Sequence, residues 1–137
     1  HRLTYTLPEY QTESGCVDIL MHTMERYFVN IETMEITDSI SESLMQTVIY
    51  NARILLNEPG NYNARAEIMW AGSLSHNGIT GLGAEKDFAV HQLGHELSAK
   101  FDIAHGQVYP LSGEHGQLMY MMQNQPDLRS MQEESGM

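Results

Sequence analysis

Residues 85–106 read EKDFAVHQLGHELSAKFDIAHG and contain three of the chain's seven histidines. The spacing of apolar residues predicts a helix over 85–101. His91 and His95 are four positions apart, so they share a face of that helix, and His105 follows near its end. Imidazoles grouped in this way suggest a metal site. Any further ligands must then come from other parts of the chain.

The overall composition is that of a soluble globular protein. The 137 residues fit one domain that can bury a core. Hydrophobic residues make up 42% of the chain and the mean hydropathy is −0.35. No apolar run approaches the roughly 18–20 residues that a membrane helix requires. We therefore expect no membrane partner.

The acidic charge narrows the possible partners further. Eighteen acidic and seven basic residues give a formal charge of −11, which repels nucleic acid and anionic lipid, so neither is expected to bind. Cys16 is the only cysteine and cannot form an internal disulfide, which favours a cytoplasmic location. The chain begins with His1 and shows no secretory leader, so we expect a processed, excised or edited sequence.

Four helices are expected, and the first follows an extended segment. Residues 1–14 favour extended backbone because Pro8 disfavours helix at the residue before it. Ser14 is a candidate cap for a helix over 15–29. Apolar residues recur there at helical spacing: Val17, Leu20, Met21, Met24 and Phe28.

The next two helices have recognisable ends. Residues 39–42 read SISE, which matches a capping box and opens the second helix, and Pro59 follows its end. Asn61 or Asn63 can cap the third helix. Its expected buried side consists of Ala66, Met69, Trp70 and Leu74. The fourth helix, over 85–101, is expected to be anchored by Phe88, Val90, Leu93, Leu97 and Phe101.

These helices have short links and no convincing strand, which predicts an all-α helical bundle. We expect a metal-binding helical domain over residues 1–106. Residues 107–137 are rich in Met and Gln and are interrupted by Pro and Gly, so we expect a divergent, weakly ordered tail.

A second pair of potential ligands lies on the first helix. Asp18 and His22 are four residues apart, as are His91 and His95. If the first and fourth helices pack together, three imidazoles and one carboxylate can meet. This donor set suits Fe²⁺ or Zn²⁺ better than Ca²⁺ or Mg²⁺. Surface imidazoles without a metal can show the same spacing, so spacing alone leaves both interpretations open.

Other catalytic motifs do not match. His95-Glu96 begins like the zinc-protease motif, but Ala99 stands where that motif requires histidine. The chain has no phosphate-binding glycine loop of the usual patterns. Ser75 and His76 lie within a helix and lack the strand–turn–helix elbow of a nucleophile, so we expect them to be structural.

Three segments resemble one known family. They are TYTLP at 4–8 leading to GCVDILMHTME at 15–25, NARILLNEP at 51–59, and HQLGHEL at 91–97 continuing to AHG at 104–106. In this order and at these separations, the sequence resembles iron-containing alcohol dehydrogenases. It is most similar to their butanol-dehydrogenase-like, NADPH-preferring branch.

The resemblance implies a helical bundle like that family's C-terminal, dehydroquinate-synthase-like domain. It implies that Asp18, His22, His91 and His105 bind Fe²⁺ or Zn²⁺, and that His95 is a catalytic residue beside the substrate and nicotinamide. The metal of such an enzyme polarises the oxygen of a small alcohol or aldehyde while hydride passes to or from NADP(H).

Several side chains near these residues are expected to be structural. By residue type and position, Glu25 is expected to be a structural partner rather than a catalyst. Trp70 and Phe88 are expected in the core rather than against substrate.

The resemblance covers only the helical half of the family. Its α/β nucleotide-binding domain has no counterpart in this sequence, so the main NADP(H) site is not expected here. Apolar faces left exposed would favour self-association or a homodimer. Two alternatives to a dehydrogenase half therefore stay open: a stand-alone helical metal-binding protein and an inactive fragment, both without redox turnover.

Overall fold

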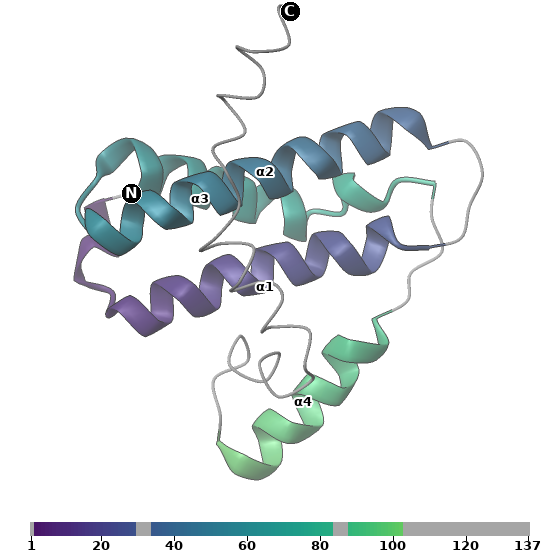
Figure 1. Ribbon diagram of the computed structural model, residues 1–137. Helices are drawn as coiled ribbons and strands as arrows, with labels where there is room; N and C mark the ends of the chain where they lie inside the picture. Colours follow the sequence, from purple (N-terminus) through teal and green to yellow (C-terminus); the bar gives the residue numbers. More distant parts are fainter. Residues whose placement is uncertain (1, 30–33, 84–87, 103–137) are drawn as a thin grey trace, which may run out of the picture.

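The computed structural model describes residues 2–29, 34–83 and 88–102 (Figure 1). Their elements are η1 (Arg2–Thr6), α1 (Glu9–Tyr27), α2 (Glu35–Asn57), α3 (Tyr62–His76), η2 (Ile79–Gly81) and α4 (Ala89–Phe101). These ranges contain helices and turns but no strand, so the all-α prediction is confirmed. The predictions for His105 and for residues 107–137 lie outside the described residues.

Helix α1 lies at the centre of the arrangement. It packs against α2 and α3, and its Glu25 contacts His91 of α4. Figure 1 shows α4 set apart from the other three helices, beyond α1. One face of α1 therefore belongs to the core and the other carries the attachment of α4.

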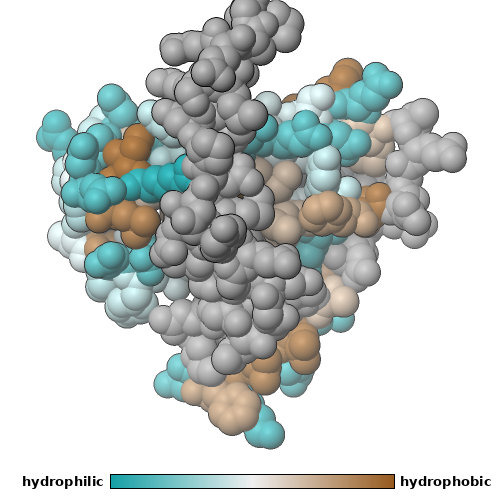
Figure 2. All heavy atoms as spheres, in the orientation of Figure 1, coloured by the Kyte–Doolittle hydropathy of each residue, from teal (hydrophilic) through white to brown (hydrophobic). Residues whose placement is uncertain are grey.

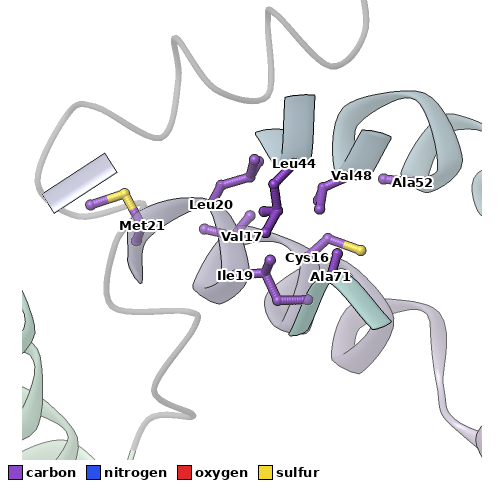
Figure 3. Packing of buried hydrophobic residues seen from close by; sticks show 9 residues of the cluster. All are labelled: Cys16, Val17, Ile19, Leu20, Met21, Leu44, Val48, Ala52 and Ala71. Carbon is purple, nitrogen blue, oxygen red and sulfur yellow. The ribbon is translucent and has the colours of Figure 1, made fainter. Parts of the chain in front are cut away.

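The hydrophobic core joins α1, α2 and α3 (Figure 3). Leu20 of α1 and Val48 of α2 have no exposed surface. The buried cluster consists of Cys16, Val17, Ile19, Leu20, Met21, Leu44, Val48, Ala52 and Ala71. Burial of each large aliphatic side chain stabilises the fold by roughly 1.5–3 kcal/mol, so these contacts hold the three helices together.

Small residues set the distance between α3 and α1. A Cβ atom at Gly72 would lie 3.3 Å from Ile19 Cδ1, and the neighbouring Ala71 is buried. This contact turns Trp70 outward, leaving 62% of it exposed. The prediction that Met69 and Trp70 are buried is therefore wrong. Shape at the helix contact, rather than hydrophobicity alone, decides which face of α3 is buried.

Two predicted helix starts are also wrong. Residues 2–6 form a 3₁₀ turn and α1 begins at Glu9, so the first 14 residues are not extended and Ser14 lies inside the helix. Pro8 precedes the helix and its carbonyl accepts hydrogen bonds from the backbone N–H groups of Gln11 and Thr12. Proline disfavours helix before itself but readily precedes one.

Helix α2 begins at Glu35, four residues before the predicted capping box. Ser39 Oγ instead donates to the carbonyl oxygen of Glu35 at 2.7 Å, a contact made within a helix. The prediction for α3 is confirmed at Asn61, whose side chain accepts from the backbone N–H of Ala64 at 3.1 Å. Capping residues thus mark helix starts only where no earlier turn continues into them.

Apolar side chains are exposed on α4 and around α2 and α3. Leu93 is 60% and Phe101 57% exposed, so the prediction that both anchor α4 is wrong. Figure 2 shows apolar atoms at the surface over α4, at the bottom of the view. A groove of about 640 Å³ between α2 and α3 is lined in part by Leu44, Trp70 and Leu74. Self-association through such surfaces stays a prediction.

None of the helices in the described ranges is both long and apolar enough to cross a membrane.

Candidate metal centre

Three acidic or imidazole side chains share the face of α1 that points away from the core. Asp18, His22 and Glu25 occupy helical positions i, i+4 and i+7. The buried residues Val17 and Leu20 lie on the opposite side of the same helix. The sequence of α1 thus builds a hydrophobic face and a ligand face from one periodic pattern.

Helix α4 is attached to this face at its first turn. Phe88 precedes the helix and forms no side-chain cap. Glu25 Oε1 instead accepts the backbone N–H of His91 at 3.2 Å, which is the bond an N-cap side chain usually makes. The negative charge of Glu25 is also favourable beside the positive end of the helix dipole.

Glu25 also orients the imidazole of His91. Its Oε2 accepts a hydrogen bond from His91 Nδ1, and His91 is buried. With Nδ1 engaged in this way, Nε2 is the ring nitrogen that faces Asp18. A carboxylate that fixes the tautomer and direction of a histidine ring is the usual partner of a metal-binding histidine. Glu25 therefore has a structural role, as expected from sequence, but toward α4.

Asp18, His22 and His91 come together as the sequence predicts. Their potential ligand atoms all lie within 4.8 Å of one another. Asp18 Oδ1 is 3.7 Å from His91 Nε2 and 3.9 Å from His22 Nε2. These separations exceed a good hydrogen bond, whereas two metal–ligand bonds of about 2.0–2.1 Å can span them. A metal ion therefore fits between these side chains.

The donor chemistry also fits a divalent transition metal. Two imidazoles and one carboxylate suit Zn²⁺ or Fe²⁺. His22 Nδ1 is buried and has no hydrogen-bond partner within the described residues. The ring nitrogen of His22 that faces Asp18 Oδ1 is Nε2, so the metal position is assigned to Nε2 and not to this Nδ1.

The electrostatics keep His22 neutral. Burial lowers the pKa of His22 to about 4, and the nearby imidazoles of His91 and His76 contribute to this shift. The ring centroids are only 4.0 Å and 4.1 Å away, respectively. Burial acts in the same direction on His91, but the charges of Asp18 and Glu25 and the hydrogen bond to Glu25 outweigh it and raise the pKa. Neutral imidazole is the form that binds metal, so the lowered pKa of His22 favours its role as a ligand.

His76 belongs to this cluster although the sequence did not predict it. His76 Nε2 lies 3.2 Å from Asp18 Oδ2, on the opposite oxygen from the one that faces His91. His76 is the last residue of α3, and no local spacing relates it to α1. Only the close packing of α3 on α1 brings these residues together, so sequence periodicity gave no signal for it.

Phe88 forms one wall of the site. Its ring meets His22 and His91 edge-on, with centroids 5.8 Å and 5.5 Å away. The guanidinium of Arg26 lies 5.2 Å from the centre of the Phe88 ring and donates a hydrogen bond to Thr80 Oγ1 at 3.1 Å. Phe88 therefore packs against the histidines rather than in the hydrophobic core.

Of the other two predicted site residues, one is outside this cluster and one is not described by the structure. His95 is exposed on α4, one turn beyond His91, and is not among the grouped ligand atoms of the described residues. His105, the fourth ligand implied by resemblance, lies outside the part of the chain that the structure describes. Three of the four predicted ligands are thus brought together.

Known proteins are similar to this chain in both sequence and fold. A sequence profile described as the Fe-containing alcohol dehydrogenase family, C-terminal, matches residues 12–132. NADH-dependent butanol dehydrogenase A of Clostridium acetobutylicum is 42% identical over 103 residues, which cover 75% of this chain and 26% of that protein. NADPH-dependent aldehyde reductase YqhD of Escherichia coli is 41% identical over 104 residues, 76% of this chain and 27% of its own length.

Solved structures agree with the sequence match. NADH-dependent butanol dehydrogenase A from Thermotoga maritima has a TM-score of 0.75 at 34% identity, over 78% of this chain and 27% of that one. Substrate- and cofactor-free YqhD from E. coli has a TM-score of 0.74 at 40% identity, over 78% and 28%. This chain spans about a quarter of the length of these relatives. It belongs to the Fe-containing alcohol dehydrogenase family and corresponds to part of the family's C-terminal region.

Proposed function

We propose that this chain supplies the metal-binding side of the active site of an NAD(P)-dependent alcohol dehydrogenase or aldehyde reductase. The observation that carries the proposal is the convergence of Asp18 and His22 from α1 with His91 from α4. Relatives named as butanol dehydrogenases and an aldehyde reductase point to a small alcohol or aldehyde as substrate. Both NADH and NADPH occur in those names, so either nicotinamide suits the proposal.

The side chains of this chain have separate roles in the proposal. Asp18, His22 and His91 hold a divalent Fe²⁺ or Zn²⁺, with His105 as a fourth ligand by resemblance. When bound, the cation supplies Lewis acidity toward the alcohol or carbonyl oxygen. Glu25 keeps His91 Nε2 directed at the site, and Phe88 packs against one side of it. His95 is assigned to the substrate side by resemblance.

Metal binding tests the ligand assignment. We expect the chain to bind one Zn²⁺ or Fe²⁺ ion, measured by elemental analysis after dialysis. Asp18→Ala, His22→Ala and His91→Ala should each lose the ion, because each removes one of few donors. His95→Ala is the matched control, an imidazole removed from α4 outside the cluster, and should keep it. Metal content unchanged in all three ligand variants would refute the assignment.

An activity assay separates the dehydrogenase from a stand-alone metal-binding protein. We expect residues 1–137 alone to bind metal without reducing butyraldehyde at the expense of NADPH or NADH. Turnover is expected when the chain is combined with the nucleotide-binding part of a relative. Turnover by residues 1–137 alone would show that no further domain is required. Metal binding without turnover in either form would favour the stand-alone metal-binding protein.

A further inference from the structure

The two oxygens of the Asp18 carboxylate face different groups. Oδ1 faces the imidazoles of His91 and His22, at 3.7 Å and 3.9 Å. Oδ2 faces His76 Nε2 at 3.2 Å, within hydrogen-bond distance. An ionised carboxylate can only accept, so the Nε2–H of His76 is the donor in this contact. One oxygen is thus held by a hydrogen bond while the other is directed at the proposed metal position.

His76 is itself held in place from the other side of its ring. His76 Nδ1 lies 2.8 Å from Ser75 Oγ and 2.9 Å from the carbonyl oxygen of Gly72. Ser75 is fully buried, and its hydroxyl is within hydrogen-bond distance of both the Gly72 carbonyl oxygen, at 3.0 Å, and His76 Nδ1. When Nε2 carries the proton donated to Asp18, Nδ1 of the neutral ring accepts, and the Ser75 hydroxyl is its donor. The imidazole therefore bridges the last turn of α3 and the Asp18 carboxylate. Its orientation is set by the Ser75 hydroxyl on one side of the ring and by Asp18 on the other.

The packing of α3 explains why the imidazole reaches Asp18. Gly72 and His76 are four residues apart and share a face of α3. A Cβ atom at Gly72 would lie 3.3 Å from Ile19 Cδ1, so this face lies directly against α1. Ile19 is the neighbour of Asp18 in sequence. The same close contact that completes the core thus delivers an imidazole to the ligand side of α1.

We propose that His76 is a positioning residue, which binds Asp18 Oδ2 so that Oδ1 is directed at the metal site formed with His22 and His91. The proposal rests on the metal site of the proposed function and adds α3 as a third helix that shapes it. Hydrogen-bonded partners of metal-binding carboxylates fix their direction, and losing one typically lowers metal affinity about 10–100-fold. His76 acts through Asp18 and is not itself a ligand.

The test compares His76→Ala and His76→Gln with the wild-type chain, residues 1–137. Zn²⁺ affinity is measured by competition with a chromogenic chelator, and the absorption spectrum of bound Co²⁺ reports the ligand geometry. We expect His76→Ala to bind Zn²⁺ about 10–100-fold more weakly, with an altered Co²⁺ spectrum. His76→Gln keeps an N–H donor of similar reach and should restore most of both properties.

Two controls separate positioning from folding. His76 is partly exposed, with 44% of its side chain accessible, so the urea midpoint of the metal-free chain should be the same for His76→Ala and wild type. His95→Ala removes an exposed imidazole outside the cluster and should leave Zn²⁺ affinity unchanged. If His76→Ala fails to fold, His76→Leu, which fills similar space without a donor, takes its place in the comparison with His76→Gln and wild type.

The outcomes distinguish this proposal from the metal site itself. Unchanged affinity and an unchanged Co²⁺ spectrum in His76→Ala would overturn the positioning role, while the losses in Asp18→Ala and His22→Ala would still support the site. Loss of the ion in His76→Ala without rescue by His76→Gln would make His76 a ligand and would also overturn it. Retained metal in Asp18→Ala and His22→Ala would instead refute the proposed function.

Discussion

Helices α2 and α4 are both attached to α1, but by different chemistry. Helix α2 buries Leu44 and Val48 against the apolar face of α1. Helix α4 makes contact through His91 and the carboxylates of the opposite face, while Leu93 stays exposed. Apolar burial needs no ion and little directional precision, whereas a cluster of imidazoles and carboxylates depends on geometry and charge. The core should therefore form without metal, whereas the position of α4 should change when metal binds.

The largest expected effect is on the core side of this comparison. Leu20→Ala removes a side chain with no exposed surface from the centre of the three-helix cluster. We expect it to lower the free energy of unfolding by roughly 2–5 kcal/mol, measured by urea denaturation. Leu93→Ala, on the exposed face of α4, should change it by less than about 0.5 kcal/mol. Equal losses would mean that α4 is held by apolar burial after all.

Metal binding should mainly stabilise the attachment of α4 to α1. A ligand at about 100 times its dissociation constant stabilises a folded chain by roughly 2.7 kcal/mol. We expect added Zn²⁺ to slow backbone hydrogen exchange in α4 more than in α2, as followed by mass spectrometry. His91→Ala should abolish this difference. Equal protection of α2 and α4 by the ion would contradict the view that metal mainly stabilises the attachment of α4.

Substitution of Gly81 tests the packing around Arg26, and Gly15 provides a control inside α1. A Cβ atom at Gly81 would lie 2.7 Å from Cδ of Arg26, the residue that packs on Phe88. We expect Gly81→Ala to lower the free energy of unfolding by roughly 1–3 kcal/mol through overpacking. Gly15→Ala, inside α1 with nothing within 4 Å, should raise it by about 0.5–1 kcal/mol. Urea denaturation would measure both, and a stabilised Gly81→Ala would contradict the packing.

The smallest expected effect concerns Cys16. Burial raises the pKa of its thiol from 9.0 to about 12. Because the unfolded chain ionises first, stability is present below pH 9 and is lost as pH rises toward 12. At mildly alkaline pH the native thiol should react with a disulfide reagent far more slowly than in urea. Rapid labelling of the native chain would show that the core face of α1 opens without unfolding.

The parts of the site that sequence predicted are those that depend on local spacing. Asp18 and His22 share a face because they are four residues apart in a helix, and His91 stands on the helix expected to pack beside them. The helical period also gave Val17 and Leu20 as core residues. These inferences needed the residue types and one assumption, namely that the first and fourth helices meet.

The parts that sequence missed depend on contacts between helices. Trp70 is exposed because Gly72 lets α3 approach Ile19 closely, and that approach also brings His76 to Asp18. Hydrophobicity along α3 favoured the larger residues for the buried side. Glu25 has a role toward α4 that its own helix does not reveal. Such features follow from shape and distance in three dimensions, which periodicity does not encode.

The proposed ligands Asp18 and His91 also enclose α2, α3 and η2 between them in the chain. An ion shared by these two residues would act as a reversible cross-link that closes a loop of roughly 70 residues. A covalent bridge of that span raises the free energy of the unfolded chain by roughly 4 kcal/mol, because it removes conformational entropy. The metal would thus tie the ends of the core segment together, in the way a disulfide does, but with a bond that a chelator can open.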